Sequence, residues 1–171
     1  LARDWEAEAR LWRRADTRQV LLRTGMVMST HPGGVFSVLA GLTRMGLGGR
    51  MGSGRQYLSW LHERDFTRAI DYLIATPALE GPVNLTAPNP TDNNSFMRSL
   101  RRAIGFRFGL PLPAWLLEIG AVFLRTETEL VLKSRKVVPA RLTASGFSFD
   151  FPNWLDAASE LTRRMRKHES E

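Results

Sequence analysis

The chain of 171 residues contains no cysteine, three histidines and two tyrosines. Without thiols it forms no disulfide and no thiolate zinc or iron–sulfur site, and three scattered histidines offer little for a histidine-rich metal site. No apolar run approaches the roughly 20 residues needed to span a bilayer, and the charged start of the sequence lacks the apolar run of a signal peptide. We therefore expect a cytoplasmic protein with no metal and no membrane partner.

Lysine is also scarce. Only three of the 24 basic residues are lysine, so arginine supplies almost all of the positive charge behind the net charge of +7. Such a charge raises the possibility of nucleic-acid binding. One acid-free arginine cluster spans residues 98–107, and a second basic cluster spans 163–167. No aromatic residues alternate with them in the manner of single-strand-binding proteins. We predict solvated helix faces and keep nucleic-acid binding through residues 98–107 as the least favoured hypothesis.

The rest of the composition, 43% hydrophobic and 24% charged, is typical of one folded domain. Apolar residues recur at helical spacing over residues 1–15, so this segment is expected to form an amphipathic helix whose apolar stripe packs against the protein. The apolar run over 19–28 is typical of a strand covered on both faces of a parallel sheet. A helix followed by such a strand indicates an α/β fold.

Later segments continue this alternation. Further elements are predicted as helices at 35–45, 65–75, 91–104, 114–123, a short helix after Pro139 and a final helix after Asn153, and as strands at 56–61, 82–85 and 147–151. Residues 46–54 contain five glycines, which allow a ligand or another chain segment to approach closely. This glycine-rich loop follows a helix and lacks G-x-G-x-x-G, so it is not a dinucleotide-binding fingerprint.

Several segments resemble one family. Leu-Leu-Arg-Thr-Gly-Met-Val at 21–27, the run Gly-Leu-Gly-Gly-Arg-Met-Gly-Ser-Gly-Arg-Gln-Tyr-Leu-Ser-Trp-Leu-His at 46–62 and Asp65 resemble the second half of the epimerase-like branch of the extended short-chain dehydrogenases/reductases. Residues 81–88 look like that branch's G-x-x-N-x-x-x-P turn. Residues 135–142, with Gly146 and Phe147, look like its short C-terminal domain of unknown function.

The resemblance covers about the whole chain and implies the C-terminal portion of a Rossmann-type fold. It implies an incomplete parallel sheet together with a mostly helical, substrate-side C-terminal subdomain. Residues 1–30 would belong to the Rossmann sheet, 31–110 to the substrate-side region and 111–166 to the C-terminal domain, followed by a frayed tail at 167–171.

In this family the N-terminal half holds NAD or NADP, and a Tyr-x-x-x-Lys pair transfers protons. Here Tyr57 and Tyr72 are followed, four residues on, by Leu61 and Thr76. We therefore assign no catalytic residue and expect the fingerprint and the pair to lie upstream of residue 1 in a longer protein. The chain alone is expected to be inactive and to bind neither cofactor tightly.

The resemblance still implies site residues. Thr24, Gly25 and Met26 end the Arg-Thr-Gly strand, where the family passes the nicotinamide ring, although backbone geometry explains Gly25 equally well. Arg55 and Gln56 are candidates for a diphosphate and for a sugar or base, since guanidinium groups match phosphate oxygens. The competing interpretation of Arg55 is a solvated arginine after a loop.

Trp60 and His62 are two residues apart and share one face if the segment is extended. We take both as candidate substrate contacts, against the alternative that they are packed core residues. Asp65 is interpreted as the acid that caps the backbone N–H groups at the start of the next helix.

The favoured function is the substrate-binding half of an NAD(P)-dependent nucleoside-diphosphate-sugar epimerase or oxidoreductase. The alternative is a non-catalytic module that forms a homo-oligomer or binds a partner through an exposed sheet edge.

Overall fold

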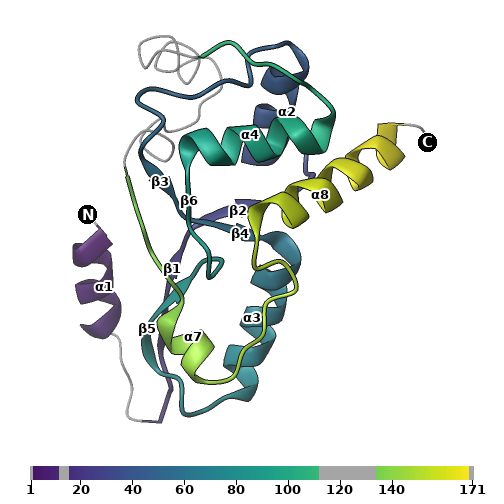
Figure 1. Ribbon diagram of the computed structural model, residues 1–171. Helices are drawn as coiled ribbons and strands as arrows, with labels where there is room; N and C mark the ends of the chain where they lie inside the picture. Colours follow the sequence, from purple (N-terminus) through teal and green to yellow (C-terminus); the bar gives the residue numbers. More distant parts are fainter. Residues whose placement is uncertain (1, 12–15, 112–133, 170–171) are drawn as a thin grey trace.

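The structure, a computed structural model, describes residues 2–11, 16–111 and 134–169. One strand in two parts runs from the bottom of the molecule in Figure 1 to its centre. Its first part, β1 (Val20–Thr24), pairs in parallel with β5 (Gly81–Leu85). Its second part, β2 (Met26–Met28), pairs in parallel with β4 (Trp60–His62). The predicted parallel pairing is confirmed, and Gly25 is the point at which the strand changes partner.

A short antiparallel ladder adjoins this sheet. β3 (Tyr57–Leu58) pairs with β6 (Thr91–Asp92). The strand predicted over 56–61 is therefore interrupted at Ser59, which lies between β3 and β4. The side chain of Ser59 is hydrogen-bonded to the backbone of Arg135 and Val137.

The upper hydrophobic core lies between β2, β4 and three helices: α2 (Val35–Arg44), α4 (Asn93–Ile104) and α8 (Trp154–Glu169). The Trp154 ring stacks on Phe96 with ring centres 3.9 Å apart and meets Trp60 edge-on at 5.0 Å. Helix α4 ends at Gly105 as predicted, with φ 92° in the left-handed region that favours glycine. The upper core thus joins helices from distant parts of the sequence.

The lower core lies between β4, β5, α3 (Glu63–Ala75) and α7 (Ala140–Ala144). The strand predicted at 147–151 is wrong, because the structure shows no strand there. Phe147 instead packs edge-on against Tyr72 at 5.3 Å, and the N–H groups of Asp150 and Phe151 donate to the Asp65 carboxylate. These backbone groups are satisfied by a side chain rather than by a neighbouring strand.

Helix α1 (Ala2–Leu11) confirms the helix expected in this segment but not its packing. Of the expected stripe, Trp5 is 67% exposed and Ala9 is partly buried, so Trp5 does not pack as expected. Residues 1 and 12 of the stripe lie outside the described residues. Residues 22–24 of β1 are exposed as well, with Leu22 at 42%, so this strand is not covered on both faces. Within the described residues, α1 is held to β1 mainly through polar contacts, including an ion pair between Arg23 Nε and Glu6 Oε1 at 2.6 Å.

Two further helix predictions concern the C-terminal third of the chain. The helix predicted at 114–123 lies outside the described residues, and α8 continues to Glu169 rather than ending near 166. None of the helices in the described ranges combines the length and the apolar character of a membrane-spanning segment.

Candidate functional site

The carboxyl ends of β1 and β5 lie side by side, with Thr24 opposite Leu85. In α/β folds, ligands bind beyond the carboxyl ends of parallel strands. Thr24 is exposed at this edge, whereas Met26 is buried at 8% exposure. Of the three predicted cofactor-binding residues, Thr24 is therefore the one with a solvent-accessible side chain.

Gly25 has a structural requirement of its own. A Cβ atom at this position would lie 2.7 Å from the carbonyl oxygen of Ser59 and 3.0 Å from the Thr86 side chain. Its N–H donates to Leu85 O at 2.9 Å, and the next N–H, of Met26, donates to Ser59 O at 2.9 Å. Close packing of three backbones thus explains this glycine, while a nicotinamide contact by residues 24–26 stays a prediction.

Residues 134–138, which we call the strap, lie across this junction. Ser59 Oγ donates to Arg135 O at 2.6 Å and accepts from Val137 N at 3.1 Å. Arg135 N also donates to Tyr57 O at 3.0 Å. The strap therefore joins the sheet junction to β3.

The strap also brings a charge to the ring of Tyr57. The Nζ atom of Lys136 lies 4.8 Å from the centre of that ring, a cation–π contact. Farther along, Asn84 Nδ2 donates to Val138 O at 3.2 Å. Sequence reasoning assigned residues 135–142 to the C-terminal domain but did not predict the contacts of the strap, because the side chains that bond to it lie 51 to 78 positions away.

The first half of the glycine-rich loop packs against the chain itself. Gly49 N donates to Leu110 O at 3.0 Å, and Leu110 N donates to Gly46 O at 2.8 Å. A Cβ on Gly49 would overlap the Leu110 carbonyl, and a Cβ on Gly109 would lie 2.6 Å from the backbone of Gly48. Another chain segment, rather than a ligand, therefore accounts for these glycines.

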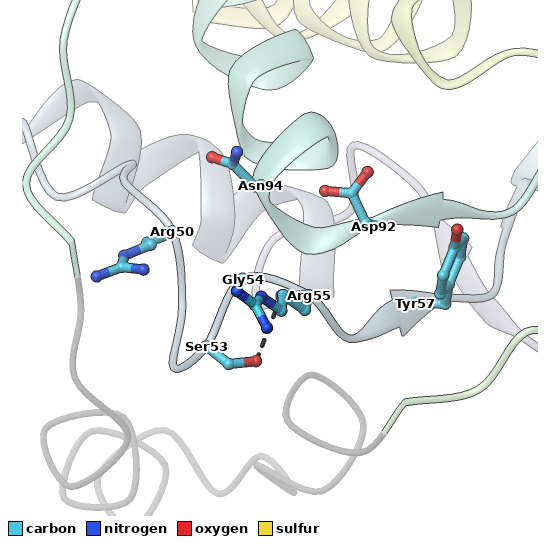
Figure 2. Close-up of a pocket in the computed structure, with 7 residues that line it drawn as sticks. All are labelled: Arg50, Ser53, Gly54, Arg55, Tyr57, Asp92 and Asn94. Atoms are coloured by element: carbon cyan, nitrogen blue, oxygen red, sulfur yellow. Dashed lines mark hydrogen bonds between the residues drawn. The ribbon is translucent and has the colours of Figure 1, made fainter.

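The second half of the loop borders a surface pocket of about 380 Å³, shown in Figure 2. The pocket is lined by residues from the loop, β3, β6 and the start of α4: Arg50, Ser53, Gly54, Arg55, Tyr57, Asp92 and Asn94. In the view of Figure 2, Arg50 lies at the left of the pocket and Tyr57 at the right, with Arg55 between them. Among the described residues, the lining thus combines two arginines, a tyrosine and an aspartate.

Both pocket arginines are exposed. The ion pairs in the described part of the chain involve other arginines, such as Arg64, Arg68 and Arg164. The guanidinium groups of Arg50 and Arg55 are therefore available to an anionic ligand.

Gln56, the other predicted substrate residue of this segment, points into the protein and is 6% exposed. Its Nε2 donates to Met51 O at 2.8 Å, and its Oε1 accepts from the Ser53 hydroxyl at 3.0 Å. Met51 N in turn donates to Asn93 Oδ1 at 2.8 Å. Gln56 therefore holds the shape of the loop, and Arg55 is the residue of the pair that lines the pocket.

Asp92 is the N-cap residue of α4, and its Oδ1 accepts from Ser95 N at 3.0 Å. Desolvation of this carboxyl acts to raise its pKa, but hydrogen bonds from Ser95 and Asn94 outweigh that effect, and the pKa lies below its ordinary value of 3.8. Asp92 is thus an ionised hydrogen-bond acceptor at neutral pH.

Trp60 and His62 are both fully buried and lie outside the pocket lining. The His62 ring stacks on Phe151 at 4.0 Å. Its Nδ1 accepts from Arg64 N at 3.1 Å, so Nε2 carries the hydrogen and donates to Glu160 Oε2 at 3.0 Å. These contacts support the packed-residue alternative; substrate contact by either residue stays a prediction.

The interpretation of Asp65 as a helix cap is wrong, because the His62 side chain caps α3. Asp65 is fully buried, and its carboxylate accepts from Asp150 N at 2.8 Å and from Phe151 N at 2.9 Å. Arg68 Nη1 lies 3.1 Å from the same carboxylate. Asp65 fixes the segment before α8 rather than the start of α3.

In the described ranges, no cluster of three or more histidine, aspartate or glutamate side chains is arranged to hold a metal ion.

Comparisons with known proteins place the chain among epimerase-like proteins. Residues 112–161 match the family described as Domain of unknown function (DUF1731). An epimerase family protein of Mycobacterium bovis is 40% identical over 161 residues, which are 94% of this chain and 52% of that protein. The chain therefore spans about half the length of the curated relatives it matches.

Solved structures give the same result. The human epimerase family protein SDR39U1, crystallised with NADPH, superposes with a TM-score of 0.82 at 33% identity, covering 94% of this chain and 53% of that one. A nucleoside-diphosphate sugar epimerase from Corynebacterium glutamicum superposes with a TM-score of 0.70 at 26% identity, covering 99% of this chain and 33% of that one. The expected α/β fold of an extended short-chain dehydrogenase/reductase is confirmed.

Proposed function

We propose that this chain, which is similar to epimerase family proteins over 94% of its length, forms the substrate-binding half of an NAD(P)-dependent extended short-chain dehydrogenase/reductase. The substrate class is a nucleoside-diphosphate sugar, the class named for the Corynebacterium glutamicum relative. The reaction class is epimerisation or oxidoreduction, with NAD or NADP as the cofactor of the complete protein.

The observation that carries this proposal is the position of the pocket beside the sheet junction. Tyr57 lines the pocket, and its carbonyl is hydrogen-bonded to the strap, which also contacts Ser59 next to Gly25. Through Tyr57 and the strap, a substrate in the pocket would therefore be connected to the edge of the sheet at which Thr24 is exposed. That edge is where α/β folds bind ligands, and the exposure of Thr24 there supports a cofactor contact by this residue. Contacts by Gly25 and Met26 stay predictions.

No catalytic step is assigned to this chain. Neither of its tyrosines is followed by a lysine four residues later. Of the two, Tyr72 donates its hydroxyl hydrogen to Ser145 O, which gives it a structural contact. We infer that the chain alone binds substrate and supports one side of the cofactor site without turnover.

Two titrations of the 171-residue chain, followed by amide NMR shifts, test this function. UDP-glucose is expected to shift amides around Arg55 and Tyr57 at concentrations up to about 5 mM, which detects millimolar dissociation constants. NADPH is expected to bind more weakly than about 1 µM. No response to UDP-glucose would contradict the substrate-binding role, and micromolar NADPH binding would contradict the placing of the cofactor mainly outside this chain.

A second candidate function is a binding or oligomerisation module, favoured by the exposed surface of α1 and β1. Trp5 and Leu11 project from α1, and Leu22 is exposed on β1. An unpaired edge with apolar side chains is a template for association. Light scattering tests this candidate. A dimer that Leu22→Lys dissociates would support it, and a monomer of 19.3 kDa at high concentration would contradict it.

A further inference from the structure

We propose that helices α4 and α8 together form a surface that binds the phosphate backbone of a nucleic-acid duplex without reading its sequence. Four exposed arginines make up this surface, which we call the arginine face: Arg98 and Arg102 on α4, and Arg163 and Arg166 on α8. None of the four lines the pocket of Figure 2, so binding at the arginine face is independent of the proposed substrate-binding function.

The packing of α4 against α8 brings together two basic clusters that are far apart in the sequence. Trp154 of α8 stacks on Phe96 of α4 with ring centres 3.9 Å apart, and its Nε1 donates to Phe96 O at 2.9 Å. The two helices adjoin in the upper part of the molecule (Figure 1). Both bury their apolar residues in the upper core, so the exposed stripes of both helices face away from that core.

Arg166 links the arginines of the two helices. Its Nη2 donates to Ile104 O, at the end of α4, at 2.7 Å, so this side chain extends from α8 to α4. Arg163 is three residues earlier and lies on the same side of α8 as Arg166. On α4, Arg98 and Arg102 are four residues apart and form one exposed stripe that leads toward Ile104. The sequence predicted separate solvated helix faces, whereas the structure makes the two clusters one surface.

Other arginines of the two clusters are used elsewhere. Arg101 turns toward the glycine-rich loop, where its Nη1 donates to Gly48 O at 2.6 Å. Arg164 lies on the other side of α8, and its Nη1 is 2.6 Å from Glu63 Oε1. The arginine face is therefore limited to four side chains, which sets the number of phosphates it neutralises at about four.

Few carboxylates oppose the charge of the arginine face. The sequence has no aspartate or glutamate from residue 93 to residue 107. On α8, Glu160 turns toward the buried His62, and its Oε1 is 3.7 Å from Arg163 Nη2. Asp156 lies in the first turn of α8, two turns before Arg163. The arginine face therefore has a net positive charge, which attracts polyanions.

The side chains around the arginines favour a phosphate backbone over a lipid surface or a protein partner. A helix that binds a membrane buries an apolar face among the acyl chains, and protein interfaces centre on buried apolar or aromatic anchors. In the part of the chain that the structure describes, none of the exposed large apolar side chains belongs to α4 or α8. Guanidinium groups match the geometry of phosphate oxygens. The arginine face therefore fits a partner recognised through charge and hydrogen bonds.

Such binding has a characteristic salt dependence. Each phosphate that a protein neutralises on a duplex contributes about −0.9 to the slope of the logarithm of the binding constant against the logarithm of the salt concentration. Four arginines predict a slope of about −3.6, which is a loss of affinity of roughly a hundredfold between about 50 and 200 mM salt. Duplexes of unrelated sequence should bind equally well, because contacts with the backbone carry no sequence information.

Fluorescence anisotropy of a labelled DNA duplex of about 20 base pairs, titrated with the 171-residue chain at several salt concentrations, tests this assignment. Arg98→Ala, Arg102→Ala and Arg163→Ala should each weaken binding several-fold at about 100 mM salt and make the slope shallower by about 0.9. Arg23→Ala is the matched control, because Arg23 is exposed on β1 in the lower part of the molecule and its loss changes the net charge equally. The slope of this control should equal that of the wild type.

Three results would overturn the assignment. The first is no change in anisotropy at about 50 mM salt, where electrostatic binding is strong. The second is an equal loss of slope in Arg23→Ala, which would show diffuse attraction to a basic protein. The third is binding to vesicles that contain phosphatidylserine without binding to the duplex, which would assign the arginine face to a membrane surface. An unchanged circular dichroism spectrum in each variant shows that a loss of affinity is not a loss of fold.

Discussion

Replacing Asp65 by alanine should cause a large loss of stability. The carboxylate is fully buried and accepts two N–H groups, from Asp150 and Phe151, in addition to its contact with Arg68. A hydrogen bond to a charged group contributes about 1.5–3 kcal/mol, and removing the acceptor leaves its donors unsatisfied. We expect a decrease of about 3–5 kcal/mol in the free energy of unfolding, a large part of the roughly 5–15 kcal/mol of a typical domain.

Urea unfolding, followed by the fluorescence of the chain's five tryptophans, measures this loss. Asp65→Asn should lose less than the alanine variant, because an amide oxygen still accepts one N–H. Hydrogen exchange at the amides of Asp150 and Phe151 should accelerate more than exchange elsewhere in both variants. This local change would identify the two N–H bonds as the cause.

Asp71→Ala is the control, since Asp71 lies on the same helix with its side chain exposed. An exposed substitution of this kind changes stability by about 0.5 kcal/mol or less. A loss below about 1 kcal/mol for Asp65→Ala would refute the reasoning, because it would mean that water or a rearranged backbone replaces both hydrogen bonds.

Three further predictions concern single side chains. Gly25→Ala should lower the free energy of unfolding by about 1–3 kcal/mol, because the new Cβ would lie 2.7 Å from Ser59 O. Gly41→Ala, whose Cβ would have open space around it inside α2, should instead raise the free energy of unfolding by about 0.5–1 kcal/mol. Differential scanning calorimetry compares the two variants. Asp92→Ala should cost about 1 kcal/mol at pH 7 as a lost helix cap. Because the folded pKa is lowered, this contribution is present above the ordinary pKa of 3.8 and disappears as the pH falls through the folded value, so the urea midpoints of the wild type and the variant should converge in acid. Trp154→Ala, which removes the ring stacked on Phe96, should cost about 3–5 kcal/mol in urea unfolding, and a cost under about 1 kcal/mol would contradict its place in the upper core.

Local patterns predicted the helices well. Periodicity located α2 and α4, and Gly105 marked the end of α4. The parallel pairing of β1 was also predictable, because a continuous apolar run is typical of such strands. The resemblance of residues 46–62 to one family gave the fold to which the comparisons also point.

What could not be predicted depends on partners far away in the sequence. Asp65 looks like a helix cap locally, yet its donors are 85 and 86 positions away. The alternation of residues 147–151 is typical of a strand, but the structure gives those backbone groups a side-chain acceptor. Trp5 and Ala9 have the four-residue spacing of a packed face, yet Trp5 is 67% exposed among the residues that the structure describes.

The candidate site was predicted in part. Arg55 was selected from its position after the glycines, and it does line the pocket. Arg50, Tyr57 and Asp92 were missed, since their convergence depends on the pairing of β3 with β6. Gln56 was selected for the same reason as Arg55, but alternation along the chain turns it toward the interior.

The central place of Trp154 has a consequence for how the protein is made. The tryptophan belongs to α8, the last helix described, but it fills the middle of a core whose other members begin at Met26. During synthesis, Met28, Phe36, Trp60 and Phe96 leave the ribosome long before the ring that covers them. Until then the nascent chain exposes apolar surface, and such species are prone to aggregation. The upper core should therefore finish packing only after α8 emerges, and the chain should depend on chaperones more than a domain built from neighbouring segments.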